Sequence, residues 1–311
     1  MDSDKESILV INLNEEYKIK IENGNQFNTS IFKDVYSSAL RNVEEIVSQS
    51  AKGNEYDDFN NIIAFTGERG KGKSSSMISF RDALVGKNND EHKFFFNDHS
   101  SLEAKKFASI DIVDPSLFRG GESLFEIILA QMFQRFQERI KEDNMKLNDD
   151  ERRAIIKQFQ EVFENLQIIN SDRKELYRKE SIEALSRLAT SSNLRKCFKK
   201  LVEIYLEKFE KGKDYLVIAI DDFDLNTSDA YKMLEDIRQF LIQSNIILLV
   251  ACKIEQLRQI ILINYYTEYE ILFKLKSSEI SESDLINKTE KYLEKLFPLN
   301  RRLELPNLKL F

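Results

Sequence analysis

The residues that could carry out chemistry in this chain gather first in a glycine-rich stretch, residues 67–74. It reads GERGKGKS and fits the pattern GxxxxGK[ST] at every fixed position. Gly67 and Gly72 would let the backbone come close to a triphosphate, so that main-chain N–H groups bind its oxygens. We predict that Lys73 reaches the β- and γ-phosphates and that Ser74 binds Mg²⁺. The predicted nucleotide-binding residues are Gly67, Glu68, Arg69, Gly70, Lys71, Gly72, Lys73, Ser74 and Ser75.

A second group of candidate residues is acidic and follows the apolar run YLVIAI at residues 215–220. Mg²⁺ bound at a phosphate loop requires an acidic partner at the end of a neighbouring buried strand. We predict that Asp221 holds Mg²⁺, directly or through water, and that Asp222 orients or deprotonates an attacking water. The alternative for this pair is a helix start, since aspartate is a good cap and turn residue. Asp224 is interpreted in that second way.

These residues need elements that bring them together, and the hydrophobic pattern predicts such elements. Short apolar runs favour strands at residues 61–66, 106–113, 215–220 and 245–252, with a last short strand within 301–306 and a hairpin at 8–21. Apolar residues at helical spacing favour helices at residues 31–50, 74–85, 122–143, 227–244, 253–263 and 281–297. Ser123 and Glu126 form a capping-box pattern at the start of one of them.

Strands that alternate with helices indicate a parallel sheet covered on both faces. We therefore predict an α/β fold of three layers with a parallel central sheet and a helical insert between the phosphate loop and the acidic strand. The expected parts are an N-terminal hairpin extension (1–30), the first part of the core (31–120), the helical insert (121–212), and the second part of the core with C-terminal helices (213–311).

Composition excludes several classes of protein. A net charge of -7 argues against a uniformly basic, nucleic-acid-coating protein, and two histidines and two distant cysteines argue against a metal site built from those residues. The longest uninterrupted apolar run, residues 246–252, is far shorter than the roughly 20 residues that cross a bilayer. The acidic, polar start MDSDKES is unlike a secretory signal. We therefore expect a cytoplasmic protein without membrane attachment.

Together these residues resemble P-loop NTPases of the additional-strand class, the group of AAA+ and STAND ATPases, and most closely the KAP family. The likeness is carried by TGERGKGKSS, by LVIAIDDFDLN followed by MLEDIRQFL, and by KYLEKLFPLNRRLELP. The resemblance implies a P-loop NTPase fold, ATP and Mg²⁺ as ligands, and ATP-driven switching, frequently in bacterial defence or membrane-associated signalling. The chain departs from the family in its helical insert, where many members have transmembrane helices, and at Leu225, where arginine is common.

Related ATPases complete the site with further cationic or polar groups. Our candidates for an arginine that neutralises γ-phosphate charge are Arg301 and Arg302, with Arg258 a weaker one, and the alternative for each is a surface arginine paired with glutamate. Lys253, after the strand at 245–252, is a candidate sensor or else an exposed helix-start lysine. A basic stretch at 185–202 could touch nucleic acid, but a solvated helix face is favoured.

The sequence thus predicts a cytoplasmic, Mg²⁺-dependent ATPase that acts as a conformational or assembly switch. We expect ATP binding to bring subunits together, with a homo-oligomer or an effector protein as partner. Bacterial anti-phage defence is one expected setting for this switch. The helical insert is a possible surface for docking a partner. The alternatives are a scaffold that binds ATP without hydrolysis, a nucleotide or small-molecule kinase, and a DNA-dependent motor.

Overall fold

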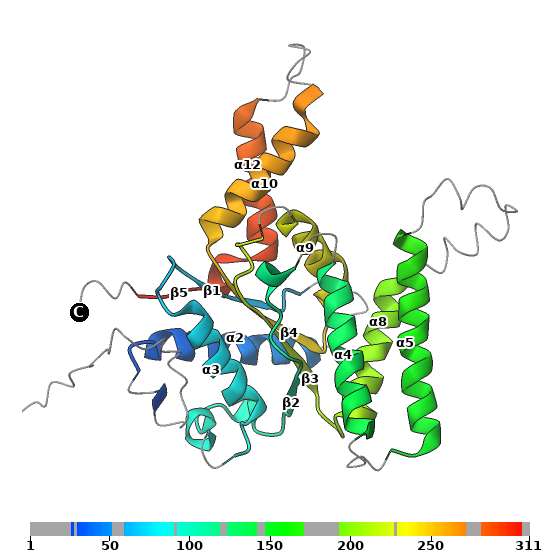
Figure 1. The fold of residues 1–311 in the computed structure, drawn as a ribbon. Coiled ribbons are helices and arrows are strands. Elements are labelled where there is room, and N and C mark those ends of the chain that lie inside the picture. Colours follow the sequence, from blue (N-terminus) through cyan, green and yellow to red (C-terminus); the bar gives the residue numbers. More distant parts are fainter. Residues whose placement is uncertain are drawn as a thin grey trace, which may run out of the picture.

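A computed structural model of the chain shows a central sheet with helices around it (Figure 1). The structure describes residues 26–27, 30–51, 59–89, 92–118, 123–141, 147–170, 193–226, 229–271 and 281–306. The sheet has five strands in the order β2-β3-β4-β1-β5, and all neighbouring pairs are parallel. The strands are β1 (Ile62–Thr66), β2 (Phe107–Ser109), β3 (Tyr215–Ile220), β4 (Ile246–Cys252) and β5 (Arg302–Glu304).

Every residue of the three central strands is buried, as expected for continuous apolar runs in a sheet covered on both faces. Successive side chains of a strand point to opposite faces. In β3, Ile218 and Ile220 therefore join one apolar core, whereas Val217 and Ala219 join the core on the other face. The predicted α/β fold with a parallel sheet and flanking helices is confirmed.

Two helices cover one face of the sheet. They are α2 (Lys33–Ala51) and α3 (Lys73–Val85), whose buried residues pack against Phe65 of β1 and Leu249 of β4. Aromatic side chains pack at the start of α2, where the ring centroids of Phe27 and Tyr36 lie 4.7 Å apart. This face therefore holds the helix that begins at the glycine-rich loop.

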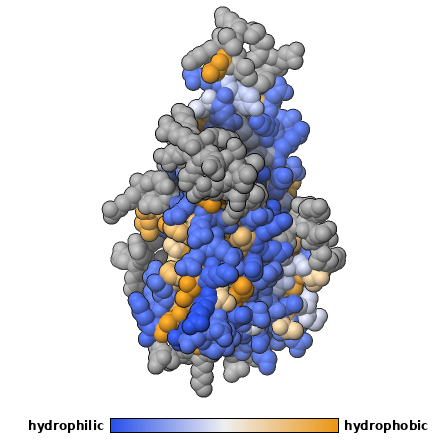
Figure 2. Space-filling model, turned by 90° about the vertical axis from the view of Figure 1, so that its right-hand side faces the viewer, coloured by the Kyte–Doolittle hydropathy of each residue, from blue (hydrophilic) through white to orange (hydrophobic). Residues whose placement is uncertain are grey.

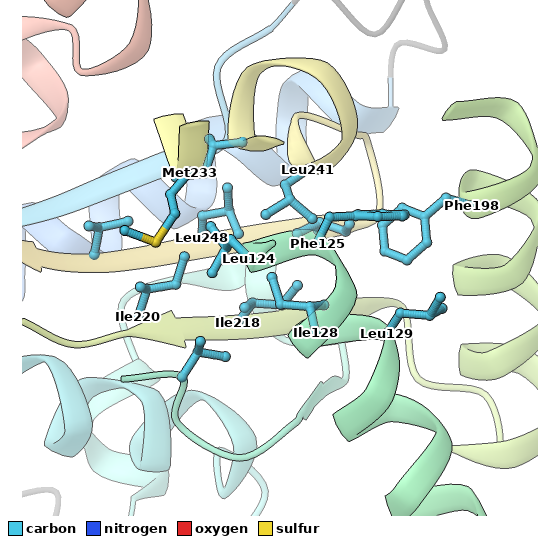
Figure 3. Close-up of a cluster of buried hydrophobic side chains, with 14 of the residues drawn as sticks. Leu124, Phe125, Ile128, Leu129, Phe198, Ile218, Ile220, Met233, Leu241 and Leu248 are labelled. Carbon is cyan, nitrogen blue, oxygen red and sulfur yellow. The ribbon is translucent and has the colours of Figure 1, made fainter. Parts of the chain in front are cut away.

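The opposite face is covered by more helices, and Figure 3 shows part of their contact with the sheet. Leu124, Phe125 and Ile128 of α4 (Leu124–Lys141) pack on Ile218 of β3 and Leu248 of β4. Buried residues of α5 (Asp149–Asn170), α8 (Leu194–Ile204), α9 (Ala230–Asp236), α10 (Ile254–Glu268) and α12 (Glu282–Leu296) belong to the same apolar core.

The described part of the predicted helical insert consists almost entirely of helices. Helices α4, α5 and α8 stand side by side (Figure 1), and a π-helical turn, Tyr205–Phe209, leads from α8 towards β3. The capping box at the start of α4 is confirmed, because the backbone N–H of Glu126 bonds Ser123 Oγ and the N–H of Ser123 bonds Glu126 Oε2. Asp236 of α9 accepts hydrogen bonds from Ser123 Oγ at 2.8 Å and Phe125 N at 3.2 Å, which attaches α4 to α9.

The outer surface of α5 carries apolar side chains as well as polar ones. Ile156, Phe163 and Ile169 are between 40% and 52% exposed. Leu129 and Phe133 of α4 line a groove of about 410 Å³ together with Ile156 and Phe163 of α5. On the side of the molecule shown in Figure 2, hydrophobic patches interrupt a mainly hydrophilic surface.

Several predicted elements differ in extent. The strand predicted at 106–113 ends at Ser109, and the chain rejoins β3 through a bridge between Val113 and Ile220. The helix predicted at 227–244 consists of α9 and a π-helical segment, Ile237–Leu241. The hairpin predicted at 8–21 lies outside the described residues. Among the described helices, none has the length and apolar character that crossing a membrane requires.

Candidate functional site

The sheet places the predicted site residues at one edge. The glycine-rich loop follows β1, the acidic residues follow β3, and Lys253 follows β4. Because β4 pairs in parallel with both β1 and β3, the carboxyl ends of the three strands lie at the same edge of the sheet. Such an edge is where open α/β sheets bind ligands.

The backbone of the loop adopts conformations that favour glycine. Gly67, Gly70 and Gly72 have φ angles of 148°, 81° and 88°. A Cβ atom at Gly72 would also lie 3.0 Å from Cζ of Phe32, so this ring would have to shift to admit a side chain. Gly72 is the N-cap of α3, so the loop leads directly into a helix N-terminus that favours anions.

Lysine and glutamate side chains surround this loop. Lys73 Nζ donates to the backbone oxygen of Glu68 at 3.2 Å, and Lys253 Nζ lies 2.7 Å from Glu68 Oε2. The hydrogen bond and the positive charge of Lys253 lower the pKa of Glu68. Lys71 is 3.8 Å from Glu304 at the end of β5. The loop is therefore rich in cations that stand at its surface.

Ser74 and Asp221 meet directly. Ser74 Oγ donates a 2.7 Å hydrogen bond to Asp221 Oδ1, and the backbone N–H of Asp222 donates to the same oxygen at 3.0 Å. Burial is the main influence on Asp221 and raises its pKa, against the hydrogen bond from Ser74 and with help from the charge of Asp222. A nearby cation or hydrogen-bond donor therefore stabilises the ionised form of this carboxyl group.

This pair fits Mg²⁺. Neighbouring ligands of an octahedral ion bound at about 2.1 Å lie about 3 Å apart, which is close to the observed oxygen separation. Mg²⁺ is ordinarily held by one or two protein oxygens together with waters and substrate phosphates. A Mg²⁺ site of this kind therefore needs no cluster of three or more metal-binding side chains. The described residues contain no such cluster.

Asp222 has an unusual backbone. Its φ angle is 45°, in the left-handed region that aspartate tolerates better than most residues. The turn it begins is closed by a 3.0 Å hydrogen bond from Leu225 N to Asp222 O. The next residue, Phe223, is buried and its N–H bonds the oxygen of Ala251 in β4. The neighbouring strand therefore holds this turn in place.

Asp224 has a role that the sequence did not indicate. It is buried, and its Oδ1 accepts a 3.0 Å hydrogen bond from the backbone N–H of Lys253. Gln256 Nε2 donates to the backbone oxygen of Asp224 at 2.9 Å. Asp224 therefore connects the acidic turn to the end of β4 and holds the backbone of Lys253 in position. Only the spatial pairing of strands reveals this contact.

The two predicted arginines are bound to other parts of the chain. Arg301 is buried, donates to the backbone oxygen of Asn42 at 2.8 Å and lies 3.3 Å from Glu45, so it attaches β5 to α2. Arg302 donates to the oxygen of Phe297 at 2.7 Å and pairs with Ala64, before the end of β1. The guanidinium of Arg301 is thus already bound within this chain, and its role as the arginine that neutralises γ-phosphate charge stays a prediction.

The other cationic candidates have simple explanations too. Arg258 forms ion pairs with Glu290 and with Glu255, as expected for a surface arginine paired with glutamate. In the basic stretch, residues 185–192 lie outside the described residues. Arg195 donates to the backbone oxygen of Ile242 at 2.7 Å, so this cation of the basic stretch stabilises the fold.

No protein-family model matches this sequence, and no curated protein matches it. The fold and the site therefore define an α/β protein with a five-stranded parallel sheet and flanking helices, and with a glycine-rich loop beside an acidic strand end.

Proposed function

We propose that the chain is a P-loop NTPase that binds and hydrolyses ATP with Mg²⁺. The observation that carries this proposal is the hydrogen bond between Ser74 and Asp221. It unites the two residues that the sequence motifs independently suggest as Mg²⁺ ligands, although they belong to separate strand ends. A chance match to the loop pattern would give no reason for this contact.

Strand order supports the class within the P-loop NTPases. Strand β4 lies between β1, which leads into the loop, and β3, which leads into Asp221. An extra strand between these two is the feature after which the additional-strand class is named. The loop residues Gly67 and Gly72 have the backbone angles that such a loop needs.

In the proposed reaction, backbone N–H groups of the loop and Lys73 bind the β- and γ-phosphates. Mg²⁺, held by Ser74 and Asp221, would neutralise charge on the phosphate oxygens. Asp222 orients a water whose oxygen attacks the γ-phosphorus while the bond to the β–γ bridging oxygen breaks. ADP and phosphate leave, and the proton lost by water passes to Asp222 or to the phosphate.

The proposed use of this chemistry is a conformational or assembly switch of the KAP and STAND type. The acidic turn and Lys253 are attached to one another through Asp224, so a phosphate bound between them can act on both. In this proposal the arginine that completes the site comes from another subunit, because Arg301 and Arg302 are bound within the fold.

The test is ATP binding and phosphate release with Mg²⁺, compared between the wild type, Lys73→Ala and Asp222→Asn. The matched control is Lys157→Ala, since Lys157 is an exposed lysine of α5 remote from the loop. We expect Lys73→Ala to lose ATP binding, Asp222→Asn to bind ATP without turnover, and the control to behave as the wild type. Failure of the wild type to bind Mg²⁺-ATP would overturn the proposal. Binding without phosphate release at any protein concentration favours the scaffold.

A further inference from the structure

The ion pair between Glu68 and Lys253 lies across the rim of the candidate phosphate loop. Building on the proposed function, we propose that Lys253 is a phosphate-contacting residue and that Glu68 holds it in a competing ion pair, so that Glu68 limits triphosphate affinity. The two charged atoms are 2.7 Å apart. Glu68 belongs to the loop after β1, and Lys253 follows β4.

The backbone of Lys253 is fixed, although its side chain is at the surface. Its N–H is bound by Asp224 Oδ1 at 3.0 Å, and the residue is the N-cap of α10. Asp224 is itself 5% exposed, so this anchor is inside the protein. Because β4 lies between β1 and β3, the backbone of Lys253 lies between the loop and the acidic turn.

Glu68 binds two of the ammonium groups of the site. Its carboxylate pairs with Lys253, and its backbone oxygen accepts from Lys73 Nζ at 3.2 Å. Glu68 is the one acidic residue in the stretch 66–75, whose cations are Arg69, Lys71 and Lys73. A bound triphosphate would repel this carboxylate and attract both lysines, so that Lys253 has to leave Glu68 in order to reach a phosphate oxygen.

The sign of the effect separates this inference from a simpler interpretation. If the ion pair only orders the loop, its removal leaves ATP affinity unchanged or lowers it. If Glu68 competes with phosphate, its neutralisation raises the affinity. Exposed ion pairs are weak, and the two side chains are 62% and 35% exposed, so the expected gain is about two- to five-fold.

The experiment measures Mg²⁺-ATP affinity by calorimetry at fixed ionic strength for the wild type, Glu68→Gln, Lys253→Met and the double variant, with thermal unfolding to verify folding. We expect Glu68→Gln to bind ATP about two- to five-fold more tightly and Lys253→Met to bind more weakly. In the Lys253→Met background the gain from Glu68→Gln should disappear. AMP, which lacks the outer phosphates, should show no gain.

Two results would overturn the inference: no gain in Glu68→Gln, or a gain of equal size in the double variant, which would indicate general repulsion without Lys253. Lys73→Ala separates this failure from failure of the proposed function. If the wild type binds ATP and Lys73→Ala does not, the site stands whatever Glu68→Gln does. If neither binds, the proposed function itself fails.

Discussion

Ser74 Oγ and Asp221 Oδ1 are 2.7 Å apart, although the two residues are 147 positions apart in the chain. A hydroxyl and a carboxylate that meet in this way offer two oxygens to one Mg²⁺. We therefore expect ATP affinity to depend on Mg²⁺ in the wild type and to fall when the ion is removed with a chelator.

Ser74→Ala and Asp221→Asn should each lose most of this Mg²⁺ dependence. Removal of a hydrogen-bonding or charged partner of this kind corresponds to a loss of about ten- to a hundred-fold in affinity. Ser100→Ala, a change at an exposed serine in a surface turn, is the control. An undiminished response of both site variants to Mg²⁺ would show that the ion binds elsewhere.

The left-handed backbone of Asp222 leads to a second prediction. Asparagine tolerates φ of 45° about as well as aspartate, so Asp222→Asn should keep its free energy of unfolding within about 0.5 kcal/mol. Its phosphate release should nevertheless fall by roughly 10²- to 10⁴-fold if the carboxylate handles the attacking water.

Asp222→Val provides the contrast, since a β-branched residue in this conformation should cost about 1–2 kcal/mol of stability. Chemical denaturation and single-turnover phosphate release measure the two effects separately. If Asp222→Asn released phosphate at the wild-type rate, the carboxylate of Asp222 would have no role in the reaction.

Glycines of the loop allow a third, graded prediction. Gly72→Ala combines an unfavourable φ with a contact 3.0 Å from Phe32, whereas Gly70→Ala has the unfavourable φ alone, with no atom within 4 Å. We expect Gly72→Ala to lose ATP binding and about 1–3 kcal/mol of stability, and Gly70→Ala to lose about 1 kcal/mol. Denaturant titrations and ATP titrations on the same samples measure both.

The control for backbone strain is Gly212→Ala. Gly212 has φ of 77° and open surroundings, and it follows the π-helical turn rather than the loop. It should cost about 1 kcal/mol and leave ATP affinity unchanged. If Gly72→Ala were no more harmful than Gly212→Ala, the contact with Phe32 would have no importance for the loop.

Arg301 provides a fourth prediction. Replacement by alanine removes a buried guanidinium from Asn42 and Glu45, which should cost about 2–4 kcal/mol of stability. The folded variant should bind ATP as the wild type does. Thermal unfolding and calorimetry below the transition measure these two quantities. A variant with full stability and lost phosphate release would instead restore Arg301 as a catalytic arginine.

Much of the fold was predictable, because its strands are apolar runs with clear limits. The run IILLVAC became β4 from its first residue to its last. The stretch at 106–113 was harder, since Ile110 and Val113 are both buried although only Phe107–Ser109 pairs as a strand. Burial creates the apolar pattern, whereas strand pairing depends on neighbours that are distant in sequence.

The candidate site was predictable where it depends on local patterns and not where it depends on tertiary contacts. Glycine spacing indicated Gly67 and Gly72, and their backbone angles agree with the expected loop. No local pattern could show that Phe32 packs on Gly72, that Asp224 binds the N–H of Lys253, or that Arg301 is buried under α2.

Strand β4 has a consequence for the size of what can bind. It separates β1 from β3 by two strand spacings, about 10 Å in all, and its backbone hydrogen bonds set that width. Loop substitutions can change which groups face the gap but not how wide the gap is at the sheet. Side chains such as Ser74 and Asp221 close this gap for a single ion, but a ligand that contacts the backbone of both the loop and the acidic turn has to match a width fixed by the sheet, which favours a molecule of constant length over a range of sizes.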